Sequence, residues 1–162
     1  MRTQLAIALA IAGLFFSAGT AAAAPNLTLD LNVACVHTEA WARRQLDQIN
    51  PGVGLSEHYS GGWSISAGWY RNSFRRGSPY LLLGYTPLRI ELPARWTIRA
   101  GITAGLVGGY TRQELPTPVM AAAEIRVIAP AGGWSLNLVG VPNRPGQGQT
   151  GFIGFQTSLP LR

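Results

Sequence analysis

Apolar and polar residues alternate with a period of two through most of this 162-residue chain. In LTLDLNVACVH, residues 27–37, the leucines fall on one face of an extended chain, and Thr28 and Asp30 fall on the other. This period is that of a β-strand, in which successive side chains point to opposite faces of the sheet. The same pattern, bounded by Gly, Pro, Asn and Ser, predicts strands over residues 27–37, 51–59, 63–73, 78–88, 96–108, 117–128, 134–142 and 151–159.

The number and length of these segments favour a closed barrel. An even number of strands, several of them reaching the roughly 9–11 residues that cross a bilayer at a tilt, is typical of outer-membrane barrels. Tryptophans near strand ends fit an interfacial aromatic girdle: Trp63, Trp69, Trp96 and Trp134. We therefore predict an all-β fold, an eight-stranded antiparallel up-and-down β-barrel of outer-membrane type. A soluble ligand-binding barrel and a β-sandwich are the alternatives.

The N-terminal residues predict export. One positive charge, an apolar run from Leu5 to Phe16 and small residues ending at Ala24 form the pattern of a signal peptide, residues 1–24, which leaves a single barrel domain over 25–162. The outer membrane is the expected location, with the periplasm as the alternative. Cys35 is the only cysteine, so no internal disulfide is expected. No metal and no cofactor are expected either.

Charged residues occur both within the predicted strands and in the segments between them. Asp30, Arg99, Glu124 and Arg126 fall in the strands, where buried charges are expected to form ion pairs. His58 matches no motif and is expected at the surface. All 13 basic residues are arginines, against 7 acidic residues. Arginine binds phosphate with two parallel hydrogen bonds, and export makes a phosphorylated lipid a better partner than nucleic acid.

Three of these arginines follow the third predicted strand in GWYRNSFRRGSP, residues 68–79. If strands one and three end at the same rim of the barrel, Arg71, Arg75 and Arg76 surround one mouth of it. We expect them to bind a phosphorylated headgroup. The alternative is a cluster of solvated surface charges.

Two stretches resemble the lipid A palmitoyltransferase family (PagP). They are GWYRNSFRRGSPYLLLGY, residues 68–85, and WTIRAGITAGLVGGYTRQELPTPVMAAAEIRV, residues 96–127, followed by WSLNLVGVPN. The resemblance implies an outer-membrane barrel that moves an acyl chain from a phospholipid to lipid A or a related lipid, and that acts as a monomer. It implies catalytic roles for His37, at the end of the first strand, and for Ser73. Asn72 is the third catalytic candidate: the family has aspartate at this position, and an amide can orient an imidazole without stabilising its charge.

The resemblance also assigns lipid-binding positions. Gly84 matches a glycine at the floor of the acyl pocket, and Pro118 and Pro142 match prolines beside a gap between strands six and seven. Proline fits such a gap because it cannot donate a ladder hydrogen bond. The family's N-terminal helix and a terminal aromatic residue are missing here. A non-catalytic lipid-binding barrel of the same architecture is therefore the alternative function.

Overall fold

The fold is described by a computed structural model over residues 26–130, 133–144 and 149–161. The predicted signal peptide, residues 1–24, lies outside the described residues. The elements in chain order are β1 (Asn26–His37), α2 (Ala40–Gln45), β2 (Ile49–His58), β3 (Trp63–Arg71), β4 (Gly77–Glu91), β5 (Thr97–Val107), β6 (Val119–Ile128), β7 (Ser135–Val141) and β8 (Phe152–Pro160). Short 3₁₀ turns at Ser60–Gly62 and Pro93–Arg95 close two of the hairpins.

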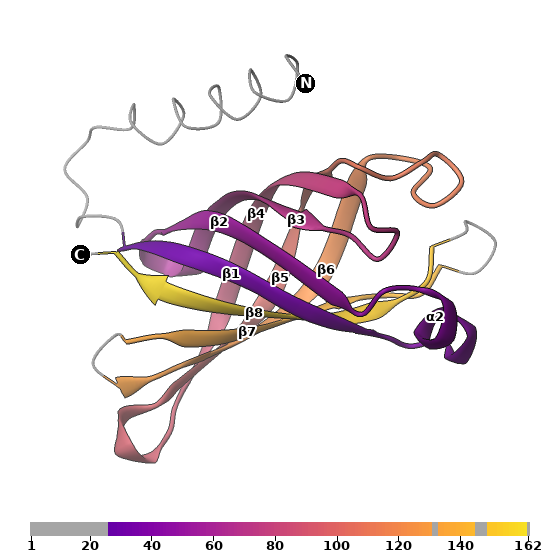
Figure 1. Ribbon diagram of the computed structural model, residues 1–162. Helices are drawn as coiled ribbons and strands as arrows, with labels where there is room; N and C mark the ends of the chain where they lie inside the picture. Colours follow the sequence, from indigo (N-terminus) through magenta and orange to yellow (C-terminus); the bar gives the residue numbers. More distant parts are fainter. Residues whose placement is uncertain (1–25, 131–132, 145–148, 162) are drawn as a thin grey trace.

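The eight strands form a closed antiparallel barrel in which each strand pairs with its neighbours in the sequence and β1 pairs with β8 (Figure 1). The predicted all-β, eight-stranded up-and-down fold is therefore confirmed. Closure gives every strand a neighbour on both sides, so the sheet has no edge strand. The stability of the sheet does not depend on a disulfide, because Cys35 is a free thiol.

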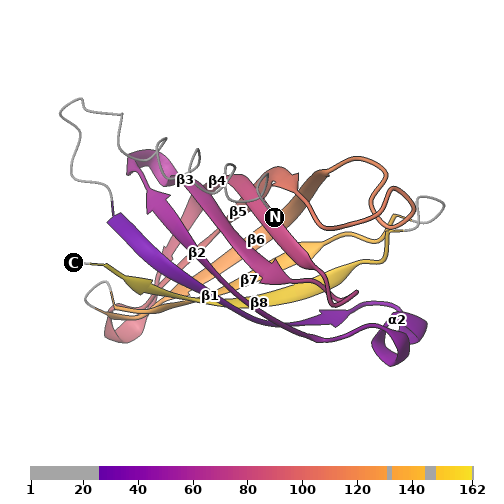
Figure 2. The ribbon, with the colours of Figure 1, turned by 45° about the horizontal axis from the view of Figure 1, so that its top comes forward.

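The connections divide the barrel into two ends. The connections that follow β1 (38–48), β3 (72–76), β5 (108–118) and β7 (142–151) leave the barrel at one end, which we call the loop end. The turns 59–62, 92–96 and 129–134 lie at the opposite end, the hairpin end, together with the start of β1 and the end of β8 (Figures 1 and 2). α2 forms in the segment between the first two predicted strands, for which the sequence predicted no helix. No helix among the described residues is long and apolar enough to span a membrane.

The outer face of the barrel is apolar, and its inner face is polar toward the hairpin end. Along the first part of β1, Thr28 and Asp30 are buried inside, whereas Leu31 and Val33 are exposed. On β3 the exposed side chains include Trp63 and Trp69. The arrangement is the reverse of that in a water-soluble globular protein, in which the apolar face is buried.

A β-bulge in β1 reverses which residues face inward. The pairing of β1 with both β2 and β8 shifts by one residue between Asn32 and Ala34. Before the bulge the even-numbered residues face inward, and after it Cys35 and His37 do, while Val36 is 47% exposed outside. Strict alternation would have placed His37 on the outer face. β-Bulges often re-aim side chains in this way.

A hydrogen-bonded polar network fills the barrel toward the hairpin end. Asp30 accepts hydrogen bonds from Thr28 and Ser56 rather than pairing with an arginine. Arg126 lies 2.8 Å from His58 Nδ1 and also donates to Asn137. The prediction of ion pairs was therefore wrong for Asp30 and Arg126: hydroxyl groups hold Asp30, and an imidazole and an amide hold Arg126. Arg99 and Glu124 likewise form no ion pair among the described residues. The prediction that His58 lies at the surface was wrong as well.

Candidate functional site

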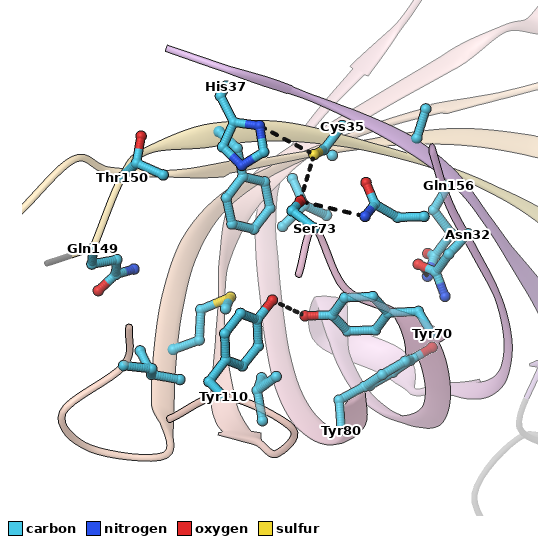
Figure 3. Close-up of a pocket in the computed structure, with 18 of the residues that line it drawn as sticks. Asn32, Cys35, His37, Tyr70, Ser73, Tyr80, Tyr110, Gln149, Thr150 and Gln156 are labelled. Carbon is cyan, nitrogen blue, oxygen red and sulfur yellow. Dashed lines mark hydrogen bonds between the residues drawn. The ribbon is translucent and has the colours of Figure 1, made fainter. Parts of the chain in front are cut away.

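The loop-end half of the barrel holds a cavity with a volume of ≈ 160 Å³ (Figure 3). Its walls are mostly apolar and aromatic, with Leu82, Val107, Met120, Val139, Tyr70, Tyr80, Tyr110, Phe152 and Phe155 among them. Its floor, toward the polar network, includes Asn32, Ser66, Glu124 and Gln156. The cavity therefore has apolar walls with polar groups at both of its ends.

Wall packing depends on two glycines that face each other across β2 and β3. Gly54 pairs with Gly68, and the ring of Tyr80 lies over both. A Cβ on Gly54 would lie 2.2 Å from the Tyr80 hydroxyl oxygen, so no larger residue fits there. Because neither glycine has a side chain, the Tyr80 ring can lie against the wall, and the centre of the barrel stays open. The buried Tyr80 hydroxyl has no hydrogen-bond partner among the described residues.

A polar cluster of Cys35, His37 and Ser73 lies at the upper end of this cavity. Cys35 Sγ is 3.8 Å from His37 Nδ1 and 3.6 Å from Ser73 Oγ, and the three residues point toward one another in Figure 3. β1 supplies the first two through the bulge, and the turn between β3 and β4 supplies the third. The structure therefore brings His37 and Ser73 to the same mouth of the barrel, with Cys35 between them.

Two amides hold this cluster in place. Gln48 Nε2 lies 3.0 Å and Gln48 Oε1 lies 3.3 Å from His37 Nδ1, so the amide can donate to a neutral imidazole or accept from a protonated one. Asn50 Nδ2 donates to Ser73 Oγ at 3.4 Å and to the Arg71 carbonyl at 3.0 Å. Sequence reasoning missed Cys35, Gln48 and Asn50.

Asn72 does not belong to this cluster. Its side chain is fully buried (0% exposed), its Nδ2 donates to Ser78 Oγ and the Gly109 carbonyl, and its Oδ1 accepts from the backbone N–H groups of Phe74 and Arg76. All of its polar atoms are used to close the turn between β3 and β4. The amide that contacts Ser73 is Asn50.

Replacing Asn72 with aspartate is expected to destabilise the protein by about 1–3 kcal/mol, because it would place a carboxylate in a fully buried position 3.0 Å from the Gly109 carbonyl oxygen, to which a carboxylate cannot donate. The free energy of unfolding in urea measures the effect. The matched control is Asn26→Asp at an exposed position, which should change stability by less than about 0.5 kcal/mol. Equal stability of Asn72→Asp and the wild type would contradict the structural role given to Asn72.

Two of the arginines predicted to bind phosphate share one carboxylate. Arg71 Nη2 lies 2.6 Å and Arg75 Nε lies 3.5 Å from Asp47 Oδ2. The backbone N–H of Ile49 and the Arg71 side chain hold the pKa of Asp47 below its ordinary value. Because one carboxylate balances two guanidinium groups, this Arg71–Asp47–Arg75 cluster keeps a net positive charge at the loop end.

Arg76 is more fully occupied. It forms an ion pair with Glu114, and its Nε donates to the Gly109 carbonyl at 3.0 Å. Its guanidinium carbon lies 5.2 Å from the centre of the Phe74 ring. These contacts tie the β3–β4 turn to the loop 108–118, so the evident role of Arg76 is to join two loops.

The ladder between β6 and β7 is interrupted at the loop end. Ala123 and Gly140 form the last pair, and residues 119–122 of β6 pair with β5 alone. Pro118 and Pro142 lie just beyond the ends of the two strands, where the predicted gap was placed. Met120 and Val139, on either side of the interruption, both line the cavity.

Gly84 lies away from the cavity lining. A Cβ at this position would come 2.4 Å from Ser64 Oγ and 3.4 Å from Glu124 Oε2. Tight packing below the floor thus explains this glycine, and the space above it is bounded by Glu124. The structure does not bring Gly84 together with the other predicted lipid-binding residues.

Fold and site together define a class: a closed eight-stranded barrel with an apolar outer face and a cavity that carries a cysteine, a histidine and a serine at its mouth. Comparison with known proteins finds no matching family model and no curated protein that matches the chain. An eight-stranded barrel of this kind is compatible with an outer-membrane location. What the protein does is therefore argued from its geometry.

Proposed function

We propose that the protein is an outer-membrane acyltransferase that moves an acyl chain from a phospholipid to lipid A or a related lipid. The observation that carries this proposal is the position of His37 and Ser73 at the mouth of an apolar cavity. An acyl chain lying in the cavity would bring its ester carbonyl to these side chains. Holding a reacting bond beside a base in this way is a large part of enzymatic rate enhancement.

The donor would reach the cavity from the membrane. Exposed leucine, isoleucine and valine side chains around the barrel suit contact with lipid tails. The interrupted ladder between β6 and β7 lies beside cavity residues Met120 and Val139, and it offers a lateral path for an acyl chain. Pro118 and Pro142 favour this interruption because neither can donate a ladder hydrogen bond.

The acceptor would bind at the loop end. The Arg71–Asp47–Arg75 cluster keeps a net positive charge there, and Arg75 is mostly exposed. Guanidinium groups bind phosphate through charge-assisted hydrogen bonds. A phosphorylated glycolipid placed on this cluster would hold its hydroxyl groups above the cavity mouth, close to His37.

Proton transfer is the role of His37 in this scheme. The imidazole takes the proton of the attacking group and returns it to the departing glycerol oxygen, so the ester bond breaks while the new acyl bond forms. The Ser73 hydroxyl donates to the carbonyl oxygen as negative charge develops on it. Gln48 can hydrogen-bond to either protonation state of the imidazole.

Filling the cavity is expected to abolish transfer. Gly154 lines the cavity, and a Cβ there meets Phe152 Cε2 at 3.7 Å and the Val139 carbonyl at 3.8 Å, which are ordinary contacts. Gly154→Leu should therefore fold but lose transfer by on the order of tenfold or more, because the acyl chain no longer fits. Refolded protein with phospholipid and lipid A provides the assay.

Two controls accompany this variant. Gly154→Ala adds only the tolerated Cβ and should keep most of the activity. Ala100→Leu places a leucine on the outer face, between the exposed Leu88 and Ile125, and should transfer at the wild-type rate. Absence of both acyl transfer and fatty acid release by the wild type would reject the proposal.

A non-catalytic lipid-binding barrel is the second candidate. The observation that favours it is the lack of a carboxylate beside the imidazole: among the described residues, no aspartate or glutamate hydrogen-bonds to His37. Such a protein would bind a phospholipid in the cavity, with Gly154→Leu lowering the affinity, but would release no product.

A further inference from the structure

Cys35 is the one residue of the polar cluster to which the proposed reaction scheme gives no role. It is 5% exposed, it lines the cavity, and the bulge in β1 turns it inward together with His37. A strand pair without the bulge would have directed both residues to the outer face. The same backbone irregularity thus delivers a thiol and an imidazole to the mouth of one cavity.

The contacts of the thiol are those of a nucleophile beside its base. Sγ lies 3.8 Å from His37 Nδ1, and the Gln48 side-chain amide, 3.0 Å from the same nitrogen, orients the imidazole. A nucleophile, a base within reach and a third group that orients the base form the recurring arrangement of covalent catalysis. Thiols are the strongest nucleophiles among protein side chains once a base removes their proton.

Ser73 is less well placed for that role. No hydrogen bond joins its hydroxyl to His37, since Cys35 Sγ lies between them, 3.6 Å from Ser73 Oγ. Ser73 Oγ instead accepts a hydrogen bond from Asn50. Either the Ser73 hydroxyl or the Cys35 thiol can donate in their contact, so the Ser73 hydroxyl is free to donate to a carbonyl oxygen in the cavity mouth.

We infer that Cys35 is the covalent nucleophile of the acyl transfer, an inference that rests on the proposed function. The sulfur attacks the ester carbonyl of the donor and forms a thioester, while the thiol proton passes through His37 to the departing glycerol oxygen. A lysophospholipid leaves. The acceptor hydroxyl, or water, then attacks the thioester, its proton passes to His37, and the returning proton restores the thiol.

An activated ester tests the nucleophile without the natural donor. A p-nitrophenyl ester of a medium-chain fatty acid is mixed with detergent-refolded protein, and the intact mass is measured after acid quenching. We expect one acyl group per chain, located on Cys35 and removed by neutral hydroxylamine as a thioester is. Cys35→Ala should remain unlabelled, Ser73→Ala should still be labelled, and His37→Gln should be labelled about 10²-fold more slowly.

Cys35→Ser keeps the size of the side chain and guards against misfolding as the cause of a loss; we expect it to give a hydroxylamine-resistant oxyester or no adduct. An adduct on Ser73, or equal labelling of Cys35→Ala and the wild type, would overturn the inference. Phospholipid and lipid A in a parallel assay test the proposed function separately. Acyl transfer by Cys35→Ala at the wild-type rate would show that Cys35 is not the nucleophile, while the proposed function would still hold.

Discussion

Replacing His37 with glutamine is expected to slow acyl transfer by about 10²–10⁴-fold, the usual contribution of a positioned general base. Glutamine fills similar space and can hydrogen-bond to Gln48, but it cannot take a proton. The rate of transfer from a labelled phospholipid measures the effect. Stability should change little, because His37 lies at the end of β1 and its side-chain partners are all at the cavity mouth.

The chain offers a matched control, since His58 is its only other histidine. His58 lies in the polar network at the hairpin end, in contact with Arg126 and Thr28. His58→Gln should keep the wild-type rate and lower only the free energy of unfolding. If His37→Gln and the wild type transfer acyl chains equally fast, His37 is not the base and the proposed reaction scheme is wrong.

The barrel could be predicted from the sequence because the two faces of each strand have different surroundings: one faces the barrel interior and the other faces outward. Alternation then records the inward and outward positions, as Thr28, Asp30 and Leu31 show. Alternation cannot predict where a strand gains an extra residue. The bulge after Asn32 and the shift between Tyr85 and Leu88 both depend on pairing with neighbouring strands.

The site could be predicted only in part, for the same reason. His37 and Ser73 were placed at one mouth because strands one and three end at the same rim, which follows from topology. Their contact with Cys35 depends on the bulge, which no local pattern in β1 indicates. The inward-facing pair Gln48 and Asn50, on either side of the exposed Ile49, was the available signal for the supporting amides.

The contacts that the loop residues make could not be predicted from the sequence. The arginines were expected to be free for phosphate, yet their partners come from distant segments: Asp47 from the first loop and Glu114 from the third. Asn72 was read beside Ser73 because the two are adjacent in sequence. In the structure the turn points them apart, and Asn72 bonds to Ser78 and Gly109.

Arginine in place of Ile102 is expected to lower the free energy of unfolding in lipid bilayers by about 2–4 kcal/mol, the cost of a cation at the bilayer midplane on the outside of a barrel. Ile102 is the middle residue of β5 and its side chain is 62% exposed. In a water-soluble barrel the same change would remove an exposed apolar group and cost less than about 0.5 kcal/mol.

Comparing two equally exposed isoleucines separates the effect of depth in the membrane from the effect of side-chain exposure. Ile49, which is 65% exposed, begins β2 at the loop end, where a bilayer would meet water. Ile49→Arg should therefore cost only about 0–1 kcal/mol. Urea unfolding of both variants in vesicles gives the two values. Equal small effects of the two substitutions, with the wild type folded and monomeric without detergent, would mean that the apolar outer face does not contact lipid and that the donor cannot reach the cavity from a membrane.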